Sequence, residues 1–261
     1  MRFAIAGNDV AGLTLALRLR IKGHDVVVHP AATSVGVAEH FTVIAPFRDL
    51  FLKSGGALDD LIGLREVVTP LMLATSGVTL ELPTAGTQVP VISRALGEAA
   101  GQQWSRLLSD AADTWLAVRT GTFTPRSSLH AYLTRHIPDR RLHDLVGALL
   151  PSSNMRQLSD AAIVFPYLRQ TFGVWEFDGG MQAFERVLRQ RCTDLGIEHA
   201  AQPAPATALC VDDHFRAVFT APRGIVRRPV MDAPVTQRLG LPFIGMAAEA
   251  IANRIGRANA Q

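Results

Sequence analysis

The first thirty residues carry the feature that most constrains the fold, a strand–turn–helix–strand pattern with glycines in its turn. Residues 2–6 have the composition of a short buried strand, and residues 7–12 form a turn with glycine at both ends. Residues 11–22 predict a helix. A run of valines at 26–28 predicts a second strand, which Pro30 stops because proline cannot donate a ladder hydrogen bond. Two strands joined by a helix in this order should be parallel, with a right-handed crossover.

The turn can be compared with the dinucleotide-binding pattern G-x-G-x-x-G. Its glycines allow a tight turn, close approach of the backbone to a pyrophosphate, and close packing of helix on strand. Gly7 and Gly12 stand at the first and third positions, and Asp9 stands at the second. The candidates for cofactor binding in this turn are Gly7, Val10, Ala11 and Gly12. Asp9 opposes a pyrophosphate, since two like charges about 4 Å apart repel by roughly 4 kcal/mol at an effective dielectric near 20. It can instead cap the helix.

The middle of the chain has the composition of a mainly helical insertion. Residues 67–93 predict a small hairpin or meander, and residues 91–118 and 127–150 predict helices. One apolar stripe runs along the first of these helices, with large side chains at helical spacing, and we interpret it as core. Its members are Trp104, Leu107, Leu108, Ala111 and Trp115. The predicted domains are residues 1–45 with 160–261, forming an α/β domain, and residues 46–159, forming the insertion.

The last hundred residues return to alternating strand-like and helical patterns. The expected elements are a strand-like segment at 167–177, a glycine turn at 178–180 leading into a helix, a strand from Ile197, a hairpin at 208–220, a Pro/Arg-rich linker at 222–238, and a strand and turn at 241–246 that lead into a final helix. Together with the first thirty residues, they predict an α/β, Rossmann-like FAD/NAD(P)-binding fold with a mainly helical insertion.

Four segments, in the right order, resemble the phytoene-desaturase-like, or amine-oxidase-like, FAD-dependent oxidoreductases. Residues 23–30, Gly-His-Asp-Val-Val-Val-His-Pro, are similar to the second-strand motif G-H-x-V-x-V-x-E. Residues 167–181 are similar to Y-x-x-Q-T-F-G-x-W followed by G-G-[LM]. Residues 47–60 and 241–248 resemble the segment after the first FAD unit and the terminal strand–helix. The resemblance implies FAD as cofactor, and it adds Gly36, Gly245, Met246 and Ala247 to the cofactor-binding candidates.

The chain also departs from this family at positions that would face the cofactor. The acid that ends the second strand and binds the adenosine ribose is replaced by Pro30. The family's G-G-[RK] turn is reduced to residues 35–38, which keep only Gly36 and lack the cation. With Asp9, these changes predict weakened or lost flavin binding. The chain is also shorter than full members, with the deficit before the terminal helix.

The first functional hypothesis is therefore an FAD-dependent oxidoreductase-like protein of the phytoene desaturase type, with an apolar small-molecule substrate. A second is a non-catalytic scaffold that pairs with an intact enzyme, another protein or a copy of itself, since the mean hydropathy of +0.17 leaves apolar surface to cover. A third is non-redox binding or catalysis of a small molecule in the vacated cleft. Whether the chain is an enzyme stays open, because no catalytic set emerges. Ser127 and Ser128 lack a nucleophile elbow, and Glu176 and Asp178 are weak candidates for a polar site.

Composition excludes several other classes. The net charge is +3, and the arginines are scattered apart from a local cluster at 223–228, which argues against nucleic-acid binding. Cys192 and Cys210 form no disulfide framework, and the histidines have no zinc-site spacing. No uncharged apolar stretch reaches the roughly 18 residues of a membrane span. We expect a cytoplasmic protein without a metal site, with peripheral membrane contact left open.

Overall fold

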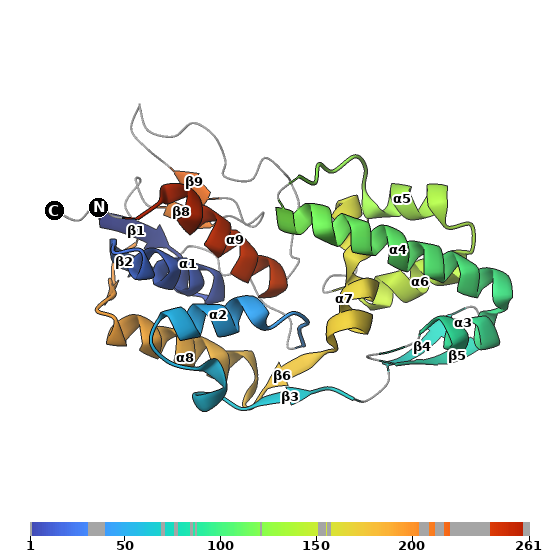
Figure 1. The fold of residues 1–261 in the computed structure, drawn as a ribbon, viewed down its shortest axis with the longest axis horizontal. Coiled ribbons are helices and arrows are strands. Elements are labelled where there is room, and N and C mark those ends of the chain that lie inside the picture. Colours follow the sequence, from blue (N-terminus) through green and yellow to red (C-terminus); the bar gives the residue numbers. More distant parts are fainter. Residues whose placement is uncertain are drawn as a thin grey trace. The chain divides into compact units, whose positions relative to one another are not determined.

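The computed structural model describes most of the chain: residues 2–30, 40–68, 71–75, 78–83, 86, 88–120, 122–150, 155, 158–203, 209–211, 217–219 and 241–257. The chain divides into two compact units (Figure 1). Unit 1 comprises Met1–Arg65, Glu176–Asp232 and Gly240–Gln261. Unit 2 comprises Glu66–Trp175 and Ala233–Leu239.

Unit 1 is built on a five-stranded sheet in the order β7-β2-β1-β8-β9. Its strands are β1 (Arg2–Ala6), β2 (Asp25–His29), β7 (Glu198–His199), β8 (Leu209–Val211) and β9 (Ala217–Phe219). β1 pairs in parallel with β2 and with β8, and β2 pairs in parallel with β7, whereas β9 is antiparallel to β8. The predicted parallel opening unit and the predicted antiparallel hairpin are both confirmed. β2 and β7 lie on one side of β1 and β8 on the other, so the carboxyl end of β1 is the topological switch point.

Helix α1 (Val10–Ile21) is the most deeply buried helix of unit 1, with every residue from Val10 to Leu19 buried. It packs against three helices, which are α2 (Ala45–Lys53), α8 (Gly180–Asp194) and α9 (Leu241–Ile255). A short 3₁₀ turn, η1 (Leu58–Asp60), follows α2. β3 (Leu64–Glu66) and β6 (Trp175–Phe177) form a two-stranded sheet where the chain passes between the units.

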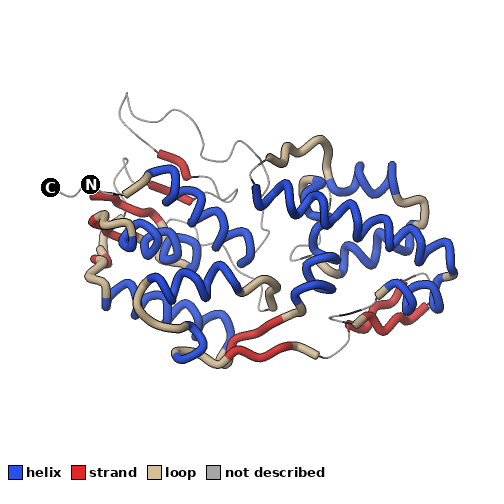
Figure 2. Tube along the Cα trace, in the orientation of Figure 1, coloured by secondary structure: helices blue, strands red, loops and turns tan. Residues whose placement is uncertain are grey.

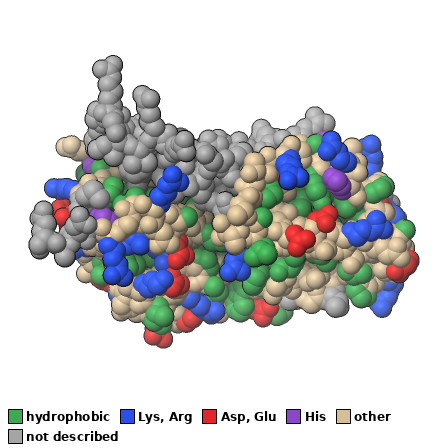
Figure 3. Space-filling model, turned by 45° about the horizontal axis from the view of Figure 1, so that its top comes forward, with side chains coloured by type: hydrophobic (Ala, Val, Ile, Leu, Met, Phe, Trp, Pro, Cys, Tyr) green, Lys and Arg blue, Asp and Glu red, His purple; other side chains and the backbone are tan. Residues whose placement is uncertain are grey.

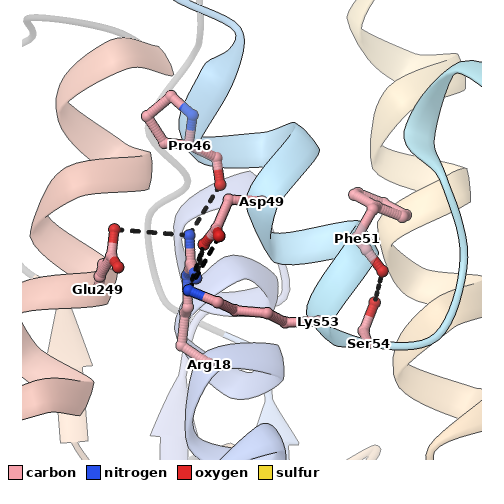
Figure 4. A network of polar contacts seen from close by, with 7 residues as sticks. All are labelled: Arg18, Pro46, Asp49, Phe51, Lys53, Ser54 and Glu249. Atoms are coloured by element: carbon pink, nitrogen blue, oxygen red, sulfur yellow. Dashed lines mark hydrogen bonds and ion pairs between the residues drawn. The ribbon is translucent and has the colours of Figure 1, made fainter.

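A buried cation on α1 links α1 to α2 and α9 (Figure 4). The guanidinium of Arg18 donates to Asp49 Oδ2 and to the carbonyl oxygen of Pro46, both at 2.7 Å, and lies 3.7 Å from a carboxylate oxygen of Glu249. Lys53 lies 2.9 Å from the same Asp49 carboxylate. Because a buried charge must be paired, this network explains how α1 carries an arginine that is only 4% exposed.

Unit 2 is mainly helical, with one β-hairpin (Figure 2). Its helices are α3 (Val89–Leu96), α4 (Glu98–Thr120), α5 (Leu129–His136), α6 (Arg140–Ala148) and α7 (Val164–Phe172), with the 3₁₀ turn η2 (Asp160–Ile163). The hairpin is formed by β4 (Leu71–Thr75) and β5 (Val78–Leu82), which pair antiparallel. The stripe predicted on α4 is core, since all five of its members are buried.

A neutral polar network lies in the core of unit 2. The side chain of Gln88 is fully buried, and its amide donates to the carbonyl oxygen of Pro83 at 3.1 Å. Its Oε1 accepts from Trp104 Nε1 at 3.2 Å, and its backbone amide donates to Gln170 Oε1 at 3.3 Å. One amide side chain therefore links the end of the hairpin to α4, and its backbone links to α7.

Three predictions about local structure are corrected. The segment at 167–177 is mostly helix α7, ended by Gly173 with φ of 70°, and only Trp175–Phe177 is strand. Residues 241–246 are the first turns of α9, not a strand, because buried Ile244, Ala248 and Ile251 recur at helical spacing. The end of the predicted meander at 67–93 is helix α3. The hairpin predicted within 67–93 is confirmed as β4 and β5. In the other two segments, composition rich in aromatic and apolar residues suits helix and strand alike, and tertiary packing decides between them.

The limits of the units also differ from the predicted limits at 45/46 and 159/160. α2 and η1 belong to unit 1 because α2 packs against α1 and α9. η2 and α7 belong to unit 2 because both pack against α4. The predicted linker at 222–238 lies outside the described residues. Among the helices that the structure describes, none is long and apolar enough to cross a membrane.

Candidate functional site

The turn between β1 and α1 retains two of the three glycine roles expected of a dinucleotide-binding turn. Gly7 has φ of 134°, which favours glycine, and its amide donates to the carbonyl oxygen of His29 at 2.9 Å, joining the ends of β1 and β2. A Cβ on Gly12 would lie 1.9 Å from the carbonyl oxygen of Gly7. Only glycine therefore allows α1 to approach the strand this closely, which is the task of the third glycine.

Asp9 occupies the middle position and caps α1. Its backbone is extended, with φ of −90° and ψ of −177°, and its Oδ1 accepts from the amide of Gly12 at 3.0 Å. The first amides of a helix have no partner within the helix, and its N-terminus attracts negative charge. The Asp9 carboxylate thus occupies the free amide and the positive end of the helix dipole that would otherwise bind a phosphate. Val10 and Ala11, the other candidates in this turn, are buried in the first turn of α1.

A cation from α8 reaches the same turn. Arg189 Nη2 donates to the carbonyl oxygen of Asn8 at 2.7 Å and to Glu185 Oε1 at 2.8 Å. Burial lowers the pKa of His199 at the end of β7, and the positive charge of Arg189 lowers it further. Arg189 is not among the candidates predicted from the sequence, and no local pattern identifies it, because the contact joins residues 181 positions apart.

The end of β2 provides no acceptor at the ribose position. Pro30 directly follows β2, and its side chain can neither accept nor donate a hydrogen bond. The preceding His29 lies with its Nδ1 3.1 Å from the carbonyl oxygen of Gln202. Gly36 and the rest of the predicted turn at 35–38 lie outside the described residues.

The three C-terminal candidates lie within α9. A Cβ on Gly245 would lie 2.7 Å from Pro46 Cβ and 3.3 Å from Phe47 Cε2, so this glycine allows close packing of α9 on α2. Ala247 is buried and Met246 is half-buried. Packing accounts for Gly245, and a role for these residues beside a cofactor stays a prediction.

The other polar candidates have structural partners. Ser127 donates from its amide and its hydroxyl to the Asp160 carboxylate, at 3.1 and 3.3 Å, and Ser128 caps α5. Glu176 pairs with Arg65 and with His40, and the Asp178 carboxylate lies against Gly63. These contacts favour the structural interpretation of all four candidates.

Cys192 of α8 is packed as a core residue and not as a reactive thiol. Cys192 is fully buried, and burial raises its pKa to about 12, which keeps the thiol protonated and unreactive. Its Sγ lies 3.8 Å from the carbonyl oxygen of Leu13. The described residues hold no cluster of three or more His, Cys, Asp or Glu side chains that could bind a metal ion.

The turn as it stands does not fit the diphosphate of a dinucleotide. Gly7 and Gly12 keep the required backbone shape, but a carboxylate already accepts from the amide of Gly12 and would repel a phosphate. Pro30 removes the acceptor that the ribose would need. The turn therefore departs from the dinucleotide-binding pattern at Asp9 and Pro30, which would face the cofactor, and agrees with it at Gly7 and Gly12, which determine packing.

No family model and no curated protein matches this chain. It is similar in structure to an oxidoreductase from Methanosarcina mazei, with 14% identity and a TM-score of 0.48, and to a variant of putrescine oxidase redesigned in its cofactor binding, with 18% identity and a TM-score of 0.49. A protein from Pyrococcus furiosus is similar at 12% identity and a TM-score of 0.46. Each likeness covers 77% of this chain, which spans about half (51%) of each of those chains. At these identities and TM-scores, the likenesses decide nothing about the activity of this chain.

Proposed function

We propose that this chain is an FAD-dependent oxidoreductase-like protein of the phytoene desaturase type in which flavin binding is weakened or lost. The observation that carries the proposal is the hydrogen bond of 3.0 Å from the amide of Gly12 to Asp9 Oδ1. It places a carboxylate at the turn where a bound dinucleotide would place its diphosphate. The parallel order of β7, β2, β1 and β8, with Gly7 and Gly12 in their expected roles, supports descent from a dinucleotide-binding unit.

Two effects oppose flavin binding, the negative charge of Asp9 and the missing hydrogen-bond acceptor at Pro30. A carboxylate and a phosphate about 4 Å apart repel by roughly 4 kcal/mol at an effective dielectric near 20. Pro30 also leaves the ribose hydroxyls without a side-chain acceptor, and a hydrogen bond to a charged acceptor such as the family's acid contributes about 1.5–3 kcal/mol. A desaturase needs the flavin to accept a hydride. Losing the flavin would therefore abolish this activity.

A non-catalytic partner subunit is the second candidate function. It is favoured by large apolar side chains that stay exposed in both units, namely Leu52 and Leu61 in unit 1 and Val68, Met72 and Leu116 in unit 2. On the face drawn in Figure 3, hydrophobic side chains lie between charged ones over much of the surface. A partner protein or a second copy would cover such side chains.

The absorbance spectrum of the purified chain tests the proposal, recorded before and after incubation with excess FAD and desalting. We expect no stoichiometric flavin bands in either sample. Flavin retained near one equivalent would contradict weakened or lost binding and favour an active oxidoreductase. Size-exclusion chromatography with light scattering on the same sample tests the second candidate. A monomer that recruits no partner on co-purification would contradict it.

A further inference from the structure

We infer that Asp9 keeps a nucleotide diphosphate off the β1–α1 turn, and that the backbone cradle formed by Gly7 and Gly12 is still present. The inference rests on the proposed weakening or loss of flavin binding, and it names the residue and the ligand group concerned. It predicts that one substitution at Asp9 restores binding of a nucleoside diphosphate to this turn.

The backbone of the cradle depends on Gly7 and Gly12, not on Asp9. Gly7 holds its φ of 134° while its amide donates to the carbonyl oxygen of His29, and Gly12 lies too close to Gly7 for any Cβ. The carbonyl oxygen of Asp9 accepts from the amide of Leu13 at 2.9 Å. Glycine at position 9 would keep that contact. The turn should therefore hold its shape when the carboxylate is removed.

Removing the Asp9 side chain would free the helix N-terminus for an anion. The amide of Gly12 would lose its carboxylate acceptor and could donate to a phosphate oxygen. The partial positive charge at the start of α1 would no longer be neutralised by an aspartate. α1 is 12 residues long and buried by α2, α8 and α9, so its N-terminus is held in place.

The guanidinium of Arg189 would become a second attraction for the diphosphate. It lies 2.7 Å from the carbonyl oxygen of Asn8, the residue before Asp9, and its other contact is the carboxylate of Glu185 at 2.8 Å. Arginine suits phosphate because its planar fork of donors can bind two oxygens at once. The ribose hydroxyls would still lack a side-chain acceptor, because Pro30 is unchanged. We therefore expect selectivity for the diphosphate and none for the nucleoside.

The test measures ADP binding by isothermal titration calorimetry to the wild-type chain and to Asp9→Gly, Asp9→Asn and Asp113→Asn. ADP is the probe because it carries the diphosphate without the flavin. We expect Asp9→Gly to bind ADP at least tenfold more tightly than the wild-type chain. Asp9→Asn should gain less, because it loses the charge but keeps a Cβ and a capping side chain. Asp113 is exposed on α4 in unit 2. Asp113→Asn removes one negative charge outside the turn, so its affinity for ADP should equal that of the wild-type chain.

Circular dichroism melts check the fold, and glycine is itself an acceptable N-cap residue. A folded Asp9→Gly chain that binds ADP no better than the wild-type chain would overturn this inference while leaving the proposed loss of flavin binding intact. If Asp9→Gly does not fold, the ADP affinity of Asp9→Asn is compared with that of Asp113→Asn. Equal affinities of these two variants would overturn the inference. Tighter binding of adenosine, which lacks the diphosphate, by Asp9→Gly would also overturn it. Stoichiometric FAD in the wild-type chain would instead contradict the proposed function.

Discussion

Each unit has one central helix, α1 in unit 1 and α4 in unit 2, and the two helices differ in how much of their surface is buried. In unit 1, every residue of α1 from Val10 to Leu19 is buried, including a charged arginine. In unit 2, α4 buries one face, on which Ala100, Gly101 and Val118 extend the predicted stripe, and its other side chains are exposed or half-buried. A helix enclosed on all sides must pair its charged groups and leave room for the neighbouring backbone. A helix with one buried face needs only well-packed side chains along that face.

The largest expected effect tests the stripe of α4. Trp104 is fully buried, and its Nε1 donates to Gln88 Oε1. Trp104→Ala should lower the free energy of unfolding by about 3–5 kcal/mol, because it leaves a cavity and an amide oxygen without its donor. Urea unfolding monitored by circular dichroism measures the change. The control is Leu116→Ala on the same helix, where the side chain is 60% exposed and the change should stay within about 0.5 kcal/mol. Equal losses in the two variants would contradict a one-sided helix.

A matched pair of glycines gives the next largest effect. A Cβ on Gly12 of α1 would lie 1.9 Å from a backbone oxygen, that of Gly7, whereas a Cβ on Gly101 of α4 would lie 1.9 Å from the side-chain oxygen of Ser93. Gly12→Ala should lower the free energy of unfolding by about 2 kcal/mol, because backbone atoms must shift. Gly101→Ala should lose less stability than Gly12→Ala, because the Ser93 hydroxyl can rotate away from the new Cβ, whereas the backbone oxygen of Gly7 cannot.

Denaturant unfolding of the two glycine variants, measured side by side with the wild-type chain, checks this difference. A loss in Gly101→Ala as large as that in Gly12→Ala would mean that α4 is as tightly enclosed as α1. A neutral Gly12→Ala would contradict the close approach of α1 to the β1–α1 turn.

The smallest effect concerns the buried charge that α1 carries. Burial alone would raise the pKa of Asp49, but the hydrogen bonds and charges of Arg18 and Lys53 outweigh it and hold the pKa below its ordinary value of 3.8. A carboxyl group with a lowered pKa in the folded state contributes stability above its unfolded pKa, and this stability is lost as the pH falls through the folded pKa. Unfolding free energies of the wild-type chain should therefore decrease as the pH falls below about 4.

The comparison variant is Asp49→Asn, in which this position no longer titrates. Hydrogen bonds from Arg141 lower the pKa of Asp139 in unit 2. Asp139 therefore contributes to the loss of unfolding free energy at low pH in the wild-type chain and in Asp49→Asn alike. Only the difference between the two curves therefore belongs to the network on α1. A decrease at low pH of the same size in the Asp49→Asn chain would show that this network does not contribute to acid sensitivity.

Much of both central helices could be predicted from the sequence, but for different reasons. The stripe on α4 is a periodic pattern, and all five predicted positions are core. α1 is predicted from apolar positions at Leu13, Ala16, Leu17 and Leu19 between the glycine turn and Gly23. Burial of Arg18 could not be predicted, since its partner Asp49 is 31 residues away and Glu249 lies on the last helix.

The sequence by itself determined the features that depend on local backbone requirements. Gly7 and Gly12 specify the shape of the β1–α1 turn, and Asp9 specifies a cap at its middle position, because these properties involve neighbours within a few residues. Only the tertiary structure decided that residues 164–172 and 241–246 are helical, and that Arg189 of α8 reaches the turn. Short apolar segments are compatible with helix and strand alike, and contacts between distant residues form only when the whole unit packs.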